Sequence, residues 1–132
     1  TLPDSDKQQA SAVFRRLAQA EAKVHGETPE TVHLHDVGAV DAIIDIVGAV
    51  SGLRMLGVEQ LYCSALPLGE GEVTGPHGRL PIPAPATLEL MASAGAPVRA
   101  TVDSNELVTP TGAAIVTTLA RFERPAMTMD AI

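Results

Sequence analysis

The chain has 132 residues, with nine Lys and Arg against 16 Asp and Glu, and a net charge of -7. This charge argues against a general phosphate-backbone binder. Only two Phe and one Tyr are available to stack on bases, so we expect no nucleic-acid partner. There is no run of about 18 apolar residues, so we expect no membrane partner. The single cysteine, Cys63, excludes an intrachain disulfide and suits a cytoplasmic protein.

The length favours one domain over residues 1–132. The chain starts at Thr1 without a methionine and ends at Ile132, directly after an alternating apolar run. We therefore expect it to be a piece of a longer protein.

The first predicted element is a helix over residues 5–25. Its apolar residues recur at helical spacing, and Gly26 provides a C-terminal stop. Ser5 with Gln8 fits a capping box. Residues 32–35 are predicted to form either a short strand or an extended lead-in to the next helix.

A second helix is predicted from Val40 to Leu56, closed by Gly57. It is apolar almost all round, so we expect it to be buried. One stripe of this helix carries the acids Asp41 and Asp45 followed by two glycines at 48 and 52. This stripe predicts close approach of another backbone or of a ligand.

The remaining segments alternate between strands and helices. We expect a buried strand over 61–66, hairpin arms at 72–74 and 79–80, a helix over 85–94, a half-buried strand over 98–102, a helix from Pro110 to about 119 capped by Thr109, and a final strand over 127–131. The fold class is α/β or mixed α+β, with about four helices interleaved with short strands in a layered single domain. Strand order stays open.

The most concentrated set of metal-ligating residue types lies around the start of the second helix. It consists of His33, His35, Asp36, Asp41 and Asp45. The two histidines point to one side if their segment is extended, and the last two acids share a helix face. Imidazole and carboxylate suit nickel, zinc, manganese or iron. Alternatively, Asp36 caps the helix, the histidines lie at its rim, and Asp41 is favoured by the helix dipole.

Two further segments could bind a substrate. The glycine-rich loop over 68–79 carries Glu70, Glu72, His77 and Arg79, although its composition favours an ordinary hairpin with solvated charges. The helix start at Thr109, Thr111 and Gly112 presents hydroxyls and free N–H groups, which can hold a phosphate or carboxylate. The simpler alternative is that Thr109 only caps the helix. Tyr62 and Cys63 are most simply core residues.

Four stretches of the chain resemble the LarC-type nickel-insertion proteins. They are Val32–Asp41 with Ile44–Gly48, Tyr62–Gly69, His77–Leu90 and Glu106–Ile115. Their order and spacing match that family through about residues 28–120. We therefore divide the chain into an N-terminal helix over 1–27, a family-like core over 28–120 and a terminal strand over 121–132.

The resemblance implies a nickel chelatase of the lyase class. Such an enzyme inserts nickel into a pyridinium bis-thiocarboxylate mononucleotide to make the nickel-pincer cofactor of lactate racemase. The reaction consumes CTP and involves a divalent cation such as manganese or magnesium. The implied partners are this nucleotide-like small molecule and the N- and C-terminal parts of the same protein, and a homo-oligomer is compatible with this implication.

This chain also departs from the family. It lacks the N-terminal motif Gly-x-Ser-Gly-Asp-Met and the C-terminal domain, where the resemblance places the CTP site. Asp36 stands where many relatives have glutamate. The preferred hypothesis is the substrate-handling core of the chelatase, with the five residues of the histidine–aspartate set at a metal or substrate site. A non-catalytic metal-binding or assembly module and a hydrolase-like phosphatase with a dinuclear metal site are the alternatives.

Overall fold

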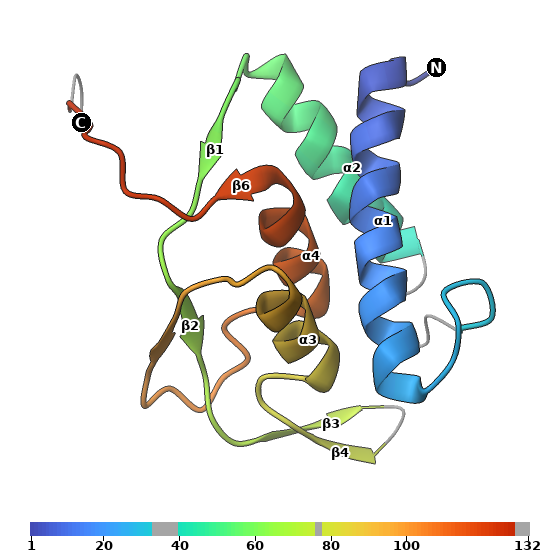
Figure 1. Ribbon diagram of the computed structural model, residues 1–132, viewed down its shortest axis with the longest axis vertical. Helices are drawn as coiled ribbons and strands as arrows, with labels where there is room; N and C mark the ends of the chain where they lie inside the picture. Colours follow the sequence, from blue (N-terminus) through green and yellow to red (C-terminus); the bar gives the residue numbers. More distant parts are fainter. Residues whose placement is uncertain (33–39, 76–77, 129–132) are drawn as a thin grey trace.

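The computed structural model describes residues 1–32, 40–75 and 78–128 (Figure 1). Within these ranges helices and short strands alternate along the chain. In order they are α1 (Asp4–His25), α2 (Val40–Met55), β1 (Leu61–Tyr62), β2 (Leu66–Leu68), β3 (Glu72–Gly75), β4 (Gly78–Pro81), α3 (Pro85–Ser93), β5 (Val98–Ala100), α4 (Pro110–Leu119) and β6 (Ala120–Arg121). The predicted class, a mixed α/β fold with four helices and short strands, is confirmed.

The ends of the helices follow local stereochemistry. Gly26 follows α1 with a φ of 69°, a left-handed conformation that glycine adopts without strain. Proline occupies the first position of both α3 and α4, where its missing N–H costs nothing. The predicted capping box of α1 is wrong: Pro3 is the N-cap. Ser5 lies inside the helix, and its hydroxyl donates to Asp6 at 3.2 Å.

Helix α1 is the central element of the core. It packs against α2, α3 and α4. Figure 1 shows α1 running vertically, with α2 beside it. The largest fully buried apolar side chains come from three of the helices: Val13, Leu17, Ile46, Val50 and Leu90. Burial of each such side chain contributes about 1.5–3 kcal/mol, so aliphatic packing around α1 compensates for the scarcity of aromatic residues.

Helix α2 is buried on one face only. Its buried residues Ala42, Ile46 and Val50 follow one another at a spacing of four, and they face the core. The prediction of burial all round is wrong, because in the described residues no second layer covers the opposite face. An added Cβ at Gly48 or Gly52 would meet no atom within 4 Å. The expected close contact at these two glycines is therefore also wrong for the described part of the chain.

The strands form three separate pairs along the edge of the helices (Figure 1). β1 pairs with β6 and β2 pairs with β5, both in parallel, while β3 and β4 form an antiparallel hairpin. The predicted hairpin is thus confirmed over its arms, and its turn at 76–77 lies outside the described residues. So does most of the extended lead-in at 32–35.

Three strand predictions need correction. The single strand expected over 61–66 is divided into β1 and β2, which pair with different partners. Tyr62 is exposed rather than in the core, and all of β5 is exposed rather than half-buried, because each strand belongs to a two-stranded sheet with little cover. Residues 127–128 form no strand. The rest of the predicted final strand, 129–131, lies outside the described residues.

Gly69, which directly follows β2, is required by a close backbone contact. The loop over 103–105 crosses it, and the Glu70 N–H donates to the Asp103 carbonyl at 2.9 Å. A Cβ on Gly69 would collide with the Asn105 carbonyl oxygen. The sequence analysis expected glycines of this loop to permit close approach to a ligand; at Gly69 the approach is to the protein's own backbone.

Replacement by alanine is predicted to change the stability of the fold in opposite directions at Gly69 and Gly48. Gly69→Ala is expected to destabilise the fold by about 1–3 kcal/mol, because the overpacked loop must move. Gly48→Ala, in the open face of a helix, is expected to stabilise it by up to about 1 kcal/mol. Urea denaturation of both variants measures these changes. Equal stability of Gly69→Ala and the unchanged chain would contradict the contact with Asn105.

Candidate functional site

Four elements meet around a small cavity at the C-terminal end of α1. The cavity has a volume of about 80 Å³. Its lining comes from the last turns of α1, from β4 and from the starts of α3 and α4: Glu21, Val24, His25, Leu80, Ala84, Pro85, Ala86 and Pro110. The hairpin and the start of α4 carry residues that the sequence predicts to bind a substrate. The fold therefore brings these two elements to the same place.

Glu21 and His25 form an acid–imidazole pair beside this cavity. They lie one helical turn apart, with Glu21 Oε2 3.5 Å from His25 Nε2, and Glu21 is buried. Sequence analysis did not single out either residue, because it considered only the apolar face and the ends of this helix. The available signal was an i, i+4 acid–histidine pair in the last turns of that helix.

The hairpin's charged side chains satisfy each other. Glu72 and Arg79 form an ion pair between β3 and β4, with side chains that are 50% and 76% exposed. Glu70 is also exposed, whereas His77 lies outside the described residues. An exposed ion pair contributes about 0–1 kcal/mol. Arg79 could therefore exchange Glu72 for an incoming anion at little energetic cost.

The start of α4 uses most of its own N–H groups. Thr109 is the N-cap, as predicted: its side-chain oxygen accepts the Gly112 N–H at 3.1 Å. The Ala113 N–H donates to the Thr109 carbonyl at 2.8 Å. In the described part of the chain this leaves the Thr111 N–H as the group without a protein acceptor. The capacity of this helix start for an anion is thus smaller than its sequence suggests.

The predicted metal ligands are only partly described. Asp41 and Asp45 are exposed in the first two turns of α2. His33, His35 and Asp36 lie outside the described residues. Across residues 1–32, 40–75 and 78–128 there is no group of three or more His, Cys, Asp and Glu side chains that could hold a metal ion.

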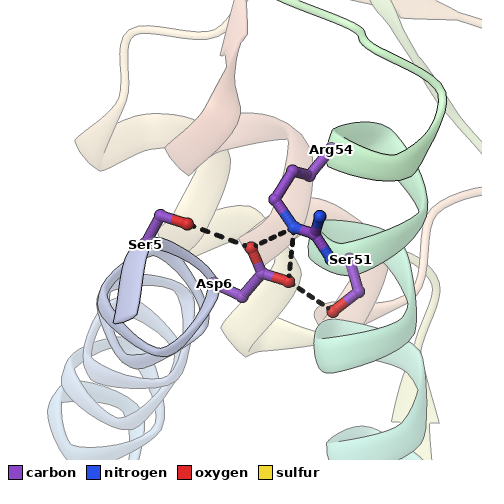
Figure 2. A network of polar contacts seen from close by, with 4 residues as sticks. All are labelled: Ser5, Asp6, Ser51 and Arg54. Carbon is purple, nitrogen blue, oxygen red and sulfur yellow. Dashed lines mark hydrogen bonds and ion pairs between the residues drawn. The ribbon is translucent and has the colours of Figure 1, made fainter. Parts of the chain in front are cut away.

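A second polar cluster joins the other end of α1 to α2 (Figure 2). Arg54 Nε lies 2.7 and 3.0 Å from the two carboxylate oxygens of Asp6, and Ser51 donates to the same carboxylate at 2.8 Å. Asp6 is only 2% exposed. The cluster borders a larger cavity of about 370 Å³. Asp6 and Glu21 are 15 positions apart in α1, or about 22 Å at 1.5 Å per residue, so the two cavities are separate.

The environment of Asp6 decides its protonation. Burial alone would raise the pKa of this carboxyl group. Hydrogen bonds from Arg54 and Ser51, with the charge of Arg54, outweigh that effect and lower the pKa below its ordinary value. Asp6 therefore stays ionised and acts as a structural anchor. Sequence analysis missed it, because Arg54 and Asp6 are 48 residues apart.

Burial has the opposite net effect on two other groups. It raises the pKa of the Cys63 thiol, so the thiolate that acts as nucleophile or metal ligand is disfavoured. It also raises the pKa of the Glu106 carboxyl group, in the segment before α4. The environment of Cys63 therefore does not activate it as a nucleophile.

These features define a small mixed α/β domain in which the hairpin and the start of α4 border a cavity beside the Glu21–His25 pair. The full chain, residues 1–132, matches the family model described as nickel insertion protein, and the chain belongs to that family. Described residues include no helix with the length and apolar character needed to cross a membrane.

Curated relatives agree with this assignment. A provisionally named nickel insertion protein of Thermomicrobium roseum is 58% identical over 95% of this chain and 31% of its own length. One from Roseiflexus castenholzii, also provisionally named, is 53% identical over 100% of the chain and 33% of its own length. The chain thus spans about a third of the length of the relatives it matches. No solved structure matches it.

The lowered pKa of Asp6 predicts how acid affects stability. Its ionised form favours the folded state, so the contribution is complete above the unfolded pKa of about 3.9. It is lost as the pH falls through the lower folded value. Asp6→Asn should therefore lower Tm clearly near pH 7 and progressively less below about pH 4. Circular dichroism melts between pH 2.5 and 7 measure this. Asp4→Asn, at an exposed ion pair, is the matched control, and a difference that does not shrink in acid would contradict the assignment.

The cap of α4 gives a separate prediction. Thr109→Ala removes the acceptor of the Gly112 N–H and should cost about 1 kcal/mol of stability. Thr111→Ala leaves that bond in place and should change the free energy of unfolding by less than half as much. Chemical denaturation of the two variants compares them directly. The reverse order of stabilities would show that Thr109 is not the effective cap.

Proposed function

We propose that this chain is the substrate-handling part of a nickel chelatase. The proposed reaction inserts nickel into a pyridinium bis-thiocarboxylate mononucleotide in a CTP-dependent step, and its product is the nickel-pincer cofactor of lactate racemase. The observation that carries the proposal is the match of all 132 residues to the nickel insertion protein family. Nickel is the cargo of this reaction, and CTP with its manganese or magnesium ion is assigned to polypeptide outside this chain.

The proposed nickel-handling residues are those predicted from the sequence. Asp41 and Asp45 lie one turn apart at the beginning of α2. In the sequence they directly follow the segment that carries His33, His35 and Asp36. Mixed imidazole and carboxylate ligands suit a divalent transition metal. The exposure of the two described aspartates supports a transfer role, because an ion that must be passed on needs a site from which it can leave.

The proposed mononucleotide contacts belong to the hairpin and to the start of α4, two elements that contribute Leu80 and Pro110 to the same cavity. The substrate is anionic, so Arg79 would leave Glu72 to meet its phosphate, assisted by the N–H and hydroxyl of Thr111. Thr109 and Gly112 would keep this helix start in shape through their own hydrogen bond. Carboxylates repel an anion. Glu70 and Glu72 therefore suit sugar hydroxyls or the metal ion better than the phosphate.

A non-catalytic metal-binding or assembly module is the second candidate function. Two observations favour it. The chain spans about a third of the length of its relatives, and one face of α2 is uncovered and apolar in the described structure. A module of this kind would bind nickel or dock onto other polypeptide without recognising the mononucleotide.

Metal titration tests the proposed ligands. Calorimetry of this chain is expected to show binding of nickel or manganese that weakens as the pH falls through about 6.5, because protonated imidazoles cannot ligate. The double variant His33→Ala, His35→Ala should abolish that binding. His25→Ala is the matched control, since it removes an imidazole outside the proposed set. Unchanged affinity in the double variant, with loss in His25→Ala, would move the site to the Glu21–His25 pair.

The same calorimetry separates the two candidate functions. Binding of the pyridinium mononucleotide by this chain, weakened by Arg79→Gln and Thr111→Ala, supports the chelatase. Metal binding without measurable affinity for the mononucleotide supports the non-catalytic module.

A further inference from the structure

The outer face of α2 is an uncovered apolar surface in the described structure. Val40, Ile44 and Met55 are 66%, 61% and 76% exposed. Helical spacing puts all three on one side, with Gly48 between them and open space above it. Asp41 and Asp45 border this side at its N-terminal end. We call these six residues the open face of α2.

An apolar helix face of this kind is rarely left in contact with water on a protein surface. Each Å² of apolar area removed from water contributes about 25 cal/mol, and contiguous exposed apolar patches generally mark sites of interaction. Gly48 adds a geometric property, because a backbone can come closer to a helix where no side chain intervenes. A helix packed at about 8–10 Å between axes would fit such a surface.

A second copy of the chain is a poor occupant. The open face is acidic at one end and apolar at the other, and Arg54, which precedes Met55 in the chain, is bound to Asp6. Two copies packed antiparallel would bury the carboxylates of one against Met55 of the other, without a partner charge. Two copies packed in parallel would place the aspartates of both against each other.

The curated relatives carry about twice as much further polypeptide as the part that this chain matches. We propose that the open face of α2 docks an apolar helix from that further polypeptide, along Val40, Ile44, Gly48 and Met55, with Asp41 and Asp45 at the border of the contact. The contact does not depend on the chelatase chemistry.

Thiol labelling tests the contact. In a Cys63→Ser background, Ile44→Cys reports on the open face, and Val102→Cys, at a side chain that is 94% exposed, is the matched control. Each is placed in this chain alone and in a chimera where the chain replaces the matched third of the Roseiflexus castenholzii relative. Labelling of Ile44→Cys should be at least about tenfold slower in the chimera, with Val102→Cys unchanged.

Three results would overturn the proposal. The first is an equal labelling rate of Ile44→Cys in both settings. The second is a labelling rate in the isolated chain that falls as its concentration rises, with a dimer in sedimentation, which would make the occupant a second copy. The third comes from hydrogen exchange on the unmodified relative, which needs no folded chimera. If the amides of the helix matched to α2 exchange as fast in the whole relative as in its isolated matching third, no further polypeptide covers that helix. Loss of nickel or mononucleotide binding would leave these readouts unaffected, so the two proposals fail separately.

Discussion

Packing of α1 against the other three helices is the interaction on which the rest of the structure depends. Val13 and Leu17 are completely buried between α2, α3 and α4. The short strand pairs could not supply an equivalent core, since each has only two strands and a lone pair is marginally stable in water. The helix therefore organises both ends of the molecule. Asp6 joins it to α2 at one end, and Glu21 and His25 border the hairpin cavity at the other.

The two ends combine charge with burial in different ways. Asp6 receives hydrogen bonds from three side chains and is held as an anion, which is the behaviour of a structural anchor. Arg79, by contrast, is mostly exposed and bound to a single carboxylate. An ion pair of that kind is easily exchanged. This contrast is the physical reason for proposing ligand recognition at the hairpin end and a role in fold stability for the Asp6 cluster.

The half-covered helix α2 connects the fold to the family. Its inner face completes the core through Ile46 and Val50, and its outer face carries the exposed aspartates of the proposed nickel site. A transfer protein must bind its metal and then release it, and a site at the border between two parts of a protein can open and close. The uncovered apolar face and the greater length of the relatives are both consistent with such a border.

The sequence by itself determined the helices, their ends and the hairpin arms. Those features depend on local chemistry: Gly26 can adopt a left-handed conformation, Pro85 and Pro110 can begin a helix, and Thr109 can cap one. It also showed the family resemblance, and it pointed to Arg79 and Thr111, which lie on two elements, β4 and α4, that line the same cavity. The histidine–aspartate set remains a prediction, because three of its members lie outside the described residues.

Only the tertiary structure decided which residues meet across long separations. The Asp6–Arg54 pair, the contact of Gly69 with Asn105 and the cavity beside Glu21 and His25 all join segments distant in sequence. The sequence also did not determine that one face of α2 is exposed. Hydrophobic patterning shows which side chains favour burial, but burial also requires a neighbouring surface. Among the described residues, the packing of the other helices leaves that face without one.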